Sequence, residues 1–335
     1  MNGKQIILAT LIALAVAGCA SKESKPAFDS SLYDGRPVDT LTSDAPPLNE
    51  TEAITRGDIA LRSNNLDLAL YEYIRSLSFP QAEFQDKTLY NIGRIHLVRG
   101  TPSLAEKAFL LSVEKNPNNV QSLEQLGSMY AKAGSVDQGA SYFRKAINAD
   151  QIRLQQSGTL KKEDFETLDK VRALPVDNSS PALSFIGLGI LGDIDDKHDL
   201  AQAYFTQALK IDSKSIKALI NLGYSYYMSG DYNTAQRFTL SALEQSPNDE
   251  KALNNLALIY LGKGEINRAL NVFKQQMETP EALNNIGYFL ILQGQADKAV
   301  PYLQQAIDKK PTYYKIANEN LERALSMIRE EKGSE

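Results

Sequence analysis

The sequence predicts an all-α fold, a superhelical solenoid of about seven helix pairs that ends in a C-terminal capping helix. The first observation behind this prediction is an internal repeat: Gly223 and Gly230 recur as Ala257 and Gly264, in each case 34 residues later. A fixed period of 20–50 residues is typical of solenoids and other repeat arrays. The second observation is a set of prolines near the expected ends of the units, where a helix must stop. They are Pro80, Pro117, Pro247, Pro280 and Pro311.

Three positions in each unit carry the repeat along the chain. A small residue inside the first helix, which lets two helices approach closely, occurs at Gly57, Gly93, Gly127, Gly189, Gly223, Ala257 and Gly287. The second helix has a small residue at Ala69, Ala105, Gly139, Ala201, Ala235, Ala269 and Ala299. A large side chain follows four positions later, at Tyr73, Phe109, Phe143, Phe205, Phe273 and Leu303. Thr239 interrupts this last series, and Phe238 beside it is the expected substitute. The pattern resembles the tetratricopeptide repeat, a helix–turn–helix unit.

Residues 1–18 have the features of a secretory signal peptide. Lys4 precedes an apolar run at residues 6–16, and small residues follow it. The run is shorter than the roughly 20 residues that a transmembrane helix needs, although an N-terminal membrane anchor helix is the alternative. Residues 16–19, Val-Ala-Gly-Cys, resemble the bacterial lipobox. That resemblance implies cleavage before Cys19 and attachment of lipid to its thiol and to the new amine.

The segment that begins at Cys19 is predicted to be a lipid-anchored tether. Cys19 is the only cysteine, so no disulfide can form within the chain. By the same resemblance, Ala20 favours the outer membrane, and we expect the body to face the periplasm. Residues 19–49 are rich in Ser, Asp, Pro and Lys, too polar to build a core of their own. We expect a flexible tether with a span on the order of 30 Å; a linker without a special role is compatible with the same composition.

The remaining chain divides around an insertion. Residues 50–150 hold the first three units, and residues 181–310 hold the last four. The interval from Gly127 to Gly189 is 62 residues, one repeat plus 28. Residues 151–180 are therefore predicted to be an inserted helix and loop, with a decayed repeat as the alternative. Residues 311–335 predict one more helix with a charged end, which suits a solvating cap on the last repeat.

Charge and composition argue against several classes of function. Removing residues 1–18 takes away Lys4 alone and leaves 35 Lys and Arg against 41 Asp and Glu, a net charge of −6. A mildly acidic body is a poor nonspecific ligand for nucleic acid, which relies on many contacts from Lys and Arg to phosphate. It is equally poor as a polybasic surface for lipid headgroups. We therefore expect no nucleic-acid partner, and membrane contact only through the lipid anchor.

The sequence offers no catalytic or metal-binding constellation, so neither an enzyme nor a cofactor is predicted. His96 lies at a first-helix position that other units fill with Tyr130, Tyr226 or Tyr260, which indicates packing. His198 lies near three aspartates, but a solvated turn is the better interpretation because no second His or Cys completes an ordered metal site. No metalloprotease, P-loop or nucleophile-elbow motif occurs.

Binding of a protein segment is the function that the repeat predicts. Stacked pairs form a superhelix whose concave face is lined mainly by first helices. Helical spacing selects the side chains expected on that face, and their Tyr, Asn and aliphatic character suits capture of a peptide or an amphipathic helix. Alternatively, some pack against the neighbouring helix or the C-terminal cap. The candidates are Tyr90, Arg94, Lys217, Ile220, Tyr224, Tyr227, Asn254, Leu258, Asn284 and Tyr288.

The last quarter of the chain resembles the TadD family, tetratricopeptide lipoproteins of tight-adherence (Flp) pilus assembly. The features that carry the resemblance are residues 282–288 (ALNNIGY), the turn at Gly294, residues 311–314 (PTYY), Ala317, Asn320 and Leu321. The resemblance implies a pilotin-like role at the outer membrane, in which the protein helps a secretin ring to localise or assemble. The implied partners are that secretin and other pilus assembly components.

Two other interpretations stay open. A type IV pilus pilotin is also a repeat lipoprotein and would differ only in the secretin that it serves. A periplasmic adaptor that docks peptidoglycan hydrolases or proteases, like the NlpI lipoproteins, belongs to a different functional class. Neither the composition nor the repeat distinguishes these three roles.

Overall fold

The computed structural model describes residues 28–37, 41–42, 44–156 and 158–333, and these residues form α-helices and one short 3-10 helix without any strand. The predicted signal peptide and Cys19 lie outside the described residues. The predicted all-α solenoid of seven helix pairs is confirmed. The pairs are α1 (Glu50–Arg62) with α2 (Leu66–Ser76), α3 (Gln85–Val98) with α4 (Pro102–Lys115), α5 (Val120–Lys132) with α6 (Val136–Arg153), α9 (Ala182–Ile194) with α10 (His198–Ile211), α11 (Ile216–Met228) with α12 (Tyr232–Gln245), α13 (Glu250–Gly262) with α14 (Ile266–Phe273), and α15 (Thr279–Leu292) with α16 (Ala296–Asp308).

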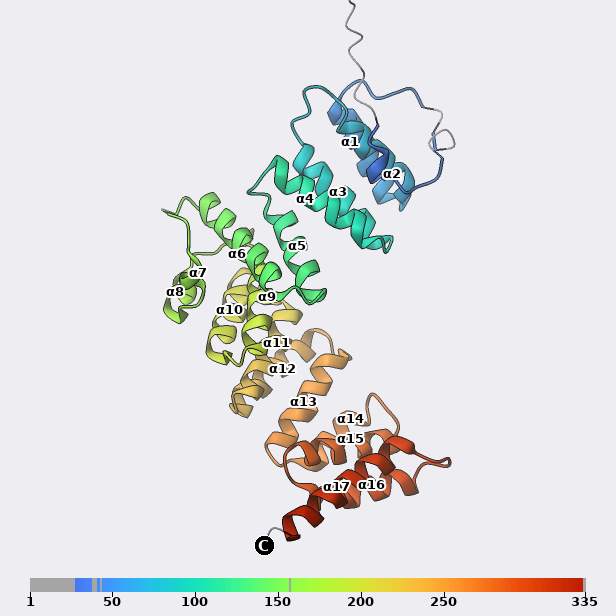
Figure 1. Ribbon diagram of the computed structural model, residues 1–335, viewed down its shortest axis with the longest axis vertical. Coiled ribbons are helices and arrows are strands. Elements are labelled where there is room, and N and C mark those ends of the chain that lie inside the picture. The colour runs from blue at the N-terminus through green and yellow to red at the C-terminus, as the bar shows by residue number, and fades with distance from the viewer. Residues whose placement is uncertain (1–27, 38–40, 43, 157, 334–335) are drawn as a thin grey trace, which may run out of the picture.

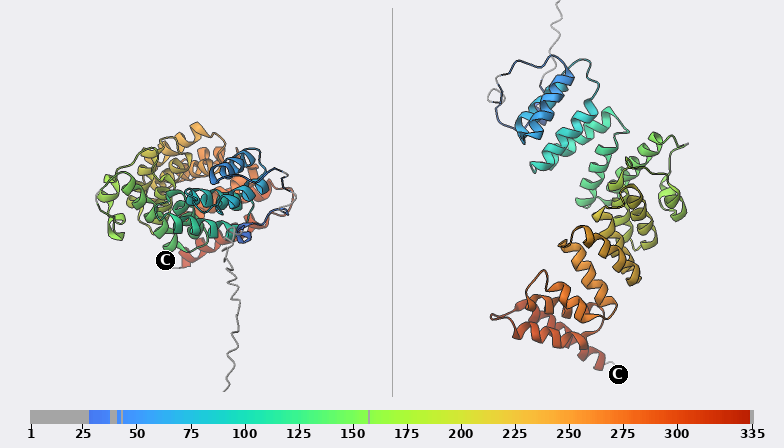
Figure 2. Two further views of the ribbon diagram at one scale, coloured as in Figure 1. Left: turned by 90° about the horizontal axis from the view of Figure 1, so that it is seen from above. Right: turned by 180° about the vertical axis from the view of Figure 1, so that it is seen from behind.

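The pairs stack along one axis, from α1 and α2 at one end to α15, α16 and α17 at the other (Figure 1). The view from above and the view from behind show the same progression (Figure 2). Each pair contacts its neighbours in the stack, and the hydrophobic core is a series of clusters rather than one centre. From α5 to α15, each first helix contacts the first helix of the next pair, whereas successive second helices make no comparable contact within the described residues. The first helices therefore line the inner, concave side of the stack.

A small residue in the first helix, glycine in every pair except the sixth, allows the close approach within a pair. A Cβ atom on Gly93 would lie 2.5 Å from the ring of Phe109, and one on Gly189 would lie 2.5 Å from the ring of Phe205. Both rings are fully buried. The two repeat positions that the sequence singles out, the small residue and the large residue, are thus the two sides of one contact.

The fifth unit departs from this arrangement and from the prediction made for it. Thr239, not Phe238, takes the position of the large side chain: it is fully buried, and a Cβ atom on Gly223 would lie 2.5 Å from its Oγ1. Phe238 is half-buried and stacks on Tyr226, with ring centroids 5.7 Å apart. The neighbouring position lies about 100° further around the helix, so Phe238 cannot reach the contact with Gly223.

The insertion contains two short helices where one was expected, α7 (Lys162–Phe165) and α8 (Leu168–Ala173). Phe165 and Val171 are both buried against the core that includes α10. In one continuous helix these side chains would point about 120° apart, because each residue turns the helix by about 100°. The break between α7 and α8 lets both side chains reach the same core.

Buried polar contacts join the insertion to α10. Gln207 is fully buried, and its Nε2 donates hydrogen bonds to the carbonyl oxygens of Val171 and Leu174, at 2.5 and 3.0 Å. The hydroxyl of Tyr204 donates to the carbonyl oxygen of Phe165. Since α10 is a second helix, the insertion covers the outer side of the fourth pair and leaves the face of the first helices open (Figure 1).

The predicted C-terminal cap is α17 (Lys315–Gly333), which packs on α15 and α16. Ala317 and Ala324 are fully buried in this contact. The outer side of the helix carries exposed charged residues such as Glu322 and Arg323. This division covers the apolar end of the stack with a solvated surface.

The structure shortens the predicted tether. Residues 28–36 pack on α2, α3 and α4 instead of running free, and Leu32 in the short helix η1 (Ser30–Leu32) is fully buried. Among the described residues, no helix is long and apolar enough to cross a membrane. The same residues contain no cluster of three or more His, Cys, Asp or Glu side chains arranged to hold a metal ion.

Candidate protein-binding groove

All ten predicted groove residues lie on first helices. Tyr90 and Arg94 are on α3; Lys217, Ile220, Tyr224 and Tyr227 are on α11; Asn254 and Leu258 are on α13; Asn284 and Tyr288 are on α15. The structure brings several of them together at two hollows on this face, which we call the upper hollow and the lower hollow.

The lower hollow, of about 300 Å³, lies between α13 and α15. Asn254, Leu258 and Tyr288 line it, three residues that the repeat register predicted. Phe273 and Phe289 form the rest of its apolar wall, with stacked rings whose centroids are 6.3 Å apart. The hollow thus combines an apolar floor with an exposed amide and a phenol, which can orient a bound peptide by hydrogen bonds.

The upper hollow, of about 700 Å³, is larger and lies beside α11 and α13. Lys217 and Ile220, two of the predicted groove residues, line it, and Lys251 and Ile190 also contribute. Ile190 was missed by the sequence reasoning, although it follows Gly189 just as Tyr224 follows Gly223. The alignment of the repeats was therefore enough to predict Ile190 as a residue of this face.

Tyrosines continue the open face along α11. The rings of Tyr224 and Tyr227 lie 6.1 Å apart, and Tyr232 at the start of α12 lies 5.8 Å from Tyr227. Tyr224 is 37% exposed, the same fraction as Tyr288 on α15. Burial raises the pKa of Tyr227, so its hydroxyl stays protonated and can donate a hydrogen bond. Exposed tyrosines are a frequent source of binding energy at protein interfaces because their rings bury large area.

Other candidates lie away from open surface or apart from the hollows. Asn284 is buried under α17, where its Oδ1 accepts a hydrogen bond of 2.9 Å from Nδ2 of Asn320. Ile220 lines the upper hollow although it is only 8% exposed. Tyr90 and Arg94 lie far along the stack on α3, where the guanidinium group of Arg94 lies 5.8 Å from the ring centre of Tyr90.

Glu124 is a further polar group on this face that the sequence reasoning did not select. It lies on α5, and its carboxylate accepts a hydrogen bond of 2.9 Å from the backbone N–H of Ser184 at the start of α9. Burial raises the pKa of Glu124 to about 7. The contact bridges the third and fourth pairs across the point where the insertion interrupts the repeat.

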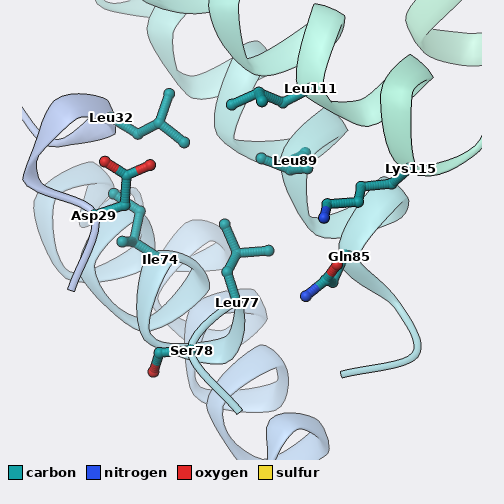
Figure 3. A pocket seen from close by; sticks show the side chains of 9 residues that line it. All are labelled: Asp29, Leu32, Ile74, Leu77, Ser78, Gln85, Leu89, Leu111 and Lys115. Atoms are coloured by element: carbon teal, nitrogen blue, oxygen red, sulfur yellow. The ribbon is translucent and has the colours of Figure 1, made fainter. Parts of the chain in front are cut away.

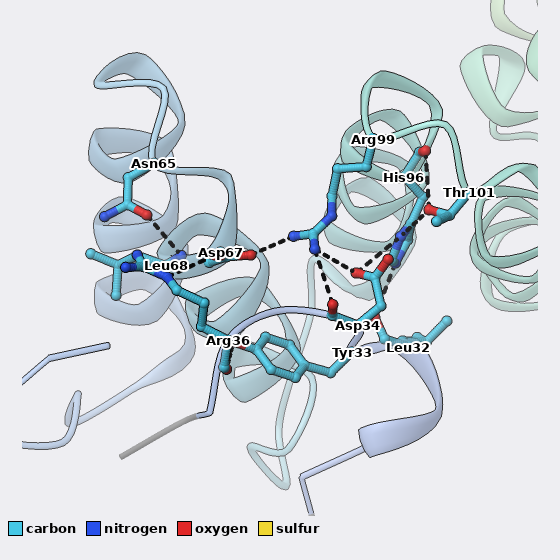
Figure 4. A network of polar contacts seen from close by, with 10 residues as sticks. All are labelled: Leu32, Tyr33, Asp34, Arg36, Asn65, Asp67, Leu68, His96, Arg99 and Thr101. Atoms are coloured by element: carbon cyan, nitrogen blue, oxygen red, sulfur yellow. Dashed lines mark hydrogen bonds and ion pairs between the residues drawn. The ribbon is translucent and has the colours of Figure 1, made fainter. Parts of the chain in front are cut away.

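A second polar site joins residues 28–36 to the outside of the first two pairs (Figure 4). Burial lowers the pKa of His96, whose neutral ring donates from Nε2 to the carbonyl oxygen of Leu32 at 3.0 Å. Arg99 contacts Asp67 at 2.5 Å and Asp34 at 3.3 Å. This network explains the histidine in a position that other units fill with tyrosine: it holds the N-terminal segment.

A small cavity of about 210 Å³ adjoins the same segment (Figure 3). Leu32, Leu77, Leu89 and Leu111 line its apolar part, and Lys115 lies at its edge. The cavity is the unfilled remainder of the surface on which η1 docks. Residues 28–36 thus occupy the outer side of the first pairs, and the face of the first helices remains free.

Comparisons with known proteins agree with this geometry. Tetratricopeptide-repeat family models match residues 90–152, 204–237, 252–286 and 280–313. The comparison with curated proteins gave no sequence match.

Solved structures of similar fold have low sequence identity to this chain. Cut9–Hcn1 from the APC/C matches with 15% identity and a TM-score of 0.52, covering 84% of this chain and 49% of that chain. A tetratricopeptide repeat protein from Parabacteroides merdae matches with 17% identity and a TM-score of 0.49, covering 82% and 98%. PilW, a type IV pilus biogenesis factor, matches with 16% identity and a TM-score of 0.49, covering 73% and 100%. Identities this low concern the fold alone. The repeat matches and the seven helix pairs identify the chain as a tetratricopeptide-repeat solenoid.

Proposed function

We propose that this protein is a non-enzymatic scaffold that captures segments of other proteins on the concave face of its first helices. The observation that carries the proposal is the open face itself, where two hollows and the exposed rings of Tyr224 and Tyr288 lie on one side of the stack. Contiguous apolar surface that a folded protein leaves open is commonly a site of interaction.

The proposal includes a lipid anchor at the outer membrane. It rests on the lipobox resemblance at residues 16–19 and on the single cysteine. The docked segment gives the anchor a definite reach: nine residue steps separate Cys19 from Phe28, and an extended chain spans at most about 3.5 Å per residue. Phe28, where the docked segment begins, would therefore stay within about 30 Å of the anchor in the lipidated protein.

We place the scaffold in pilus assembly as a pilotin-like factor for a secretin, most specifically in the Flp system. The support is the resemblance of residues 282–288 and 311–321 to the TadD family, together with the lipobox. A type IV pilus pilotin and a periplasmic adaptor for hydrolases or proteases share the same anchor and repeat. They are the alternatives that the experiment must separate.

Crosslinking in intact cells, followed by purification of the chain and identification of its partners, tests the proposal. We expect a secretin and pilus components to be recovered with the native chain and to be lost from a Cys19→Ala variant. Recovery of cell-wall hydrolases or proteases without a secretin would favour the adaptor. Unchanged recovery from the Cys19→Ala variant would contradict a role for the anchor.

A further inference from the structure

The charged residues of the concave face are distributed unevenly. On α11, the concave face includes the positions of Lys217, Ile220, Asn221, Tyr224, Tyr227 and Met228. The equivalent positions of the other six first helices follow from the repeat. The cations at these positions are Arg62, Lys87, Arg94, Lys132, Lys217 and Lys251. The anions are Asp58, Glu124, Asp193 and Glu281. On a chain with net charge −5, this face is cationic.

Each of the four anions has a partner inside the protein. Asp58 accepts a hydrogen bond from the hydroxyl of Tyr73 at 2.6 Å, and Glu124 accepts one from a backbone N–H of α9. Asp193 accepts from the hydroxyl of Ser225 at 2.7 Å and contacts His198. Glu281 pairs with Lys310. The anions therefore serve the fold and are not available to a ligand.

Within the part of the chain that the structure describes, the six cations have no such partners. Among the described residues none of them forms an ion pair, and Arg94 and Lys87 only approach aromatic rings. Burial within the groove and the charges of Lys132 and Lys251 lower the pKa of Lys217. Asp249 and Glu250 at the rim of the upper hollow offset this charge only in part, because Asp249 caps α13 through the N–H of Ala252 at 3.0 Å.

Apolar side chains are concentrated at the other end of the same face. In the first three pairs, the positions equivalent to Tyr224 and Met228 hold mostly charged or polar residues. From the fourth pair onward, the same positions hold mainly apolar or aromatic residues. These are Ile190, Ile194, Tyr224, Met228, Leu258, Tyr288 and Leu292, and five of them are more than a third exposed.

We infer that the segment captured by this groove combines a run of apolar side chains with flanking aspartates or glutamates. The apolar run lies on the last four pairs, and the acidic residues face the cations of the first pairs and of the upper hollow. Complementary charge at an interface selects the partner and its register more than it adds affinity. This inference rests on the proposed function and specifies the chemistry of its partner.

Selection from a random 15-residue peptide library on the immobilised full-length chain tests this inference. The decisive variant reverses three groove charges, Lys132→Glu, Lys217→Glu and Lys251→Glu. A matched variant makes the same change in charge at exposed lysines of other surfaces: Lys145, Lys274 and Lys309. Equal thermal midpoints of the three proteins verify that the fold is retained.

We expect peptides enriched on the native chain and on the matched variant to combine apolar residues with an excess of Asp and Glu. An enriched acidic peptide should bind the groove variant at least about tenfold more weakly, because the reversal removes three attractive charges and places three glutamates opposite the acidic residues of the peptide. Enrichment without an acidic excess, or equal binding to the groove variant, would overturn the inference while leaving groove capture intact. No enrichment over the bare support would count against the proposed function itself.

Discussion

The contact between one small and one large residue is the smallest unit of this fold. Where the large residue is aromatic, as in Phe109 against Gly93, the contact is apolar and fully buried. Thr239 places a hydroxyl in the same environment, and its Oγ1 has no hydrogen-bond partner among the described residues. The unpaired hydroxyl therefore gives this contact in the fifth pair a cost that a phenylalanine or leucine at the same position avoids.

Replacing Thr239 with valine should remove that cost. Valine has nearly the same shape, and an unpaired buried hydroxyl costs on the order of 1 kcal/mol or more. We expect the free energy of unfolding to rise by about 1 kcal/mol, measured by urea denaturation. Thr206→Val is the control, because Thr206 is exposed and its hydroxyl donates to the carbonyl oxygen of Gln202. A destabilised Thr239→Val protein would show that the hydroxyl has a partner in solution.

Glu124 predicts a dependence of stability on pH. Burial raises its folded-state pKa to about 7 from an ordinary value of 4.5, so the folded protein binds a proton that the unfolded chain has lost. Stability from this group is then fully present below about pH 4.5 and decreases as the pH rises toward 7, by up to about 3 kcal/mol. The charged and polar groups that interact with the Glu124 carboxyl group include Asp150, Lys217 and the N–H of Ser184.

A Glu124→Gln variant should lose this decrease, since glutamine can still accept the hydrogen bond but does not titrate. Urea denaturation midpoints between pH 4.5 and 8 measure the effect. Glu114→Gln, at an exposed position on α4, should keep the pH dependence of the native chain. Identical pH profiles for Glu124→Gln and the native chain would refute the assignment.

Among the contacts between elements, the docking of residues 28–36 on the first two pairs has the largest consequence for the proposed function. Residues 28–36 join the predicted anchor to α2, α3 and α4 through Leu32, His96 and Arg99. The docked segment holds the chain on the outer side of the stack. With the lipid anchor proposed above, this contact would decide which face the protein presents to a partner.

A Leu32→Ala variant should release this segment. Truncating a fully buried leucine costs roughly 3 kcal/mol, which corresponds to about a hundredfold faster local opening. Hydrogen exchange of the amides in residues 30–36 should accelerate by that order, while exchange in α13 to α16 stays unchanged. Leu48→Ala, at a leucine that is 87% exposed, is the control. Equal exchange in both variants would mean that Leu32 does not hold the segment.

At the scale of the whole molecule, the sequence predicted what the repeat encodes. The spacing of Gly223 and Ala257 identifies the pairs, and the same register places Leu258 and Tyr288 at one hollow. Features outside the repeat could not be predicted this way. Leu32 meets His96 across 64 residues of chain, and Asn284 is covered only because α17 folds back on α15. Such contacts depend on tertiary packing and leave no periodic signal.

Site-specific photocrosslinking in intact cells tests whether a partner binds on the concave face of the first helices. A photoreactive residue at Tyr224 or Tyr288 samples the concave face, and one at Leu240 on the second helix α12 samples another surface with 38% exposure, close to the 37% of both tyrosines. We expect a specific adduct with a secretin or pilus component from the two tyrosine positions and none from Leu240. A specific adduct from Leu240 alone would contradict capture by the groove.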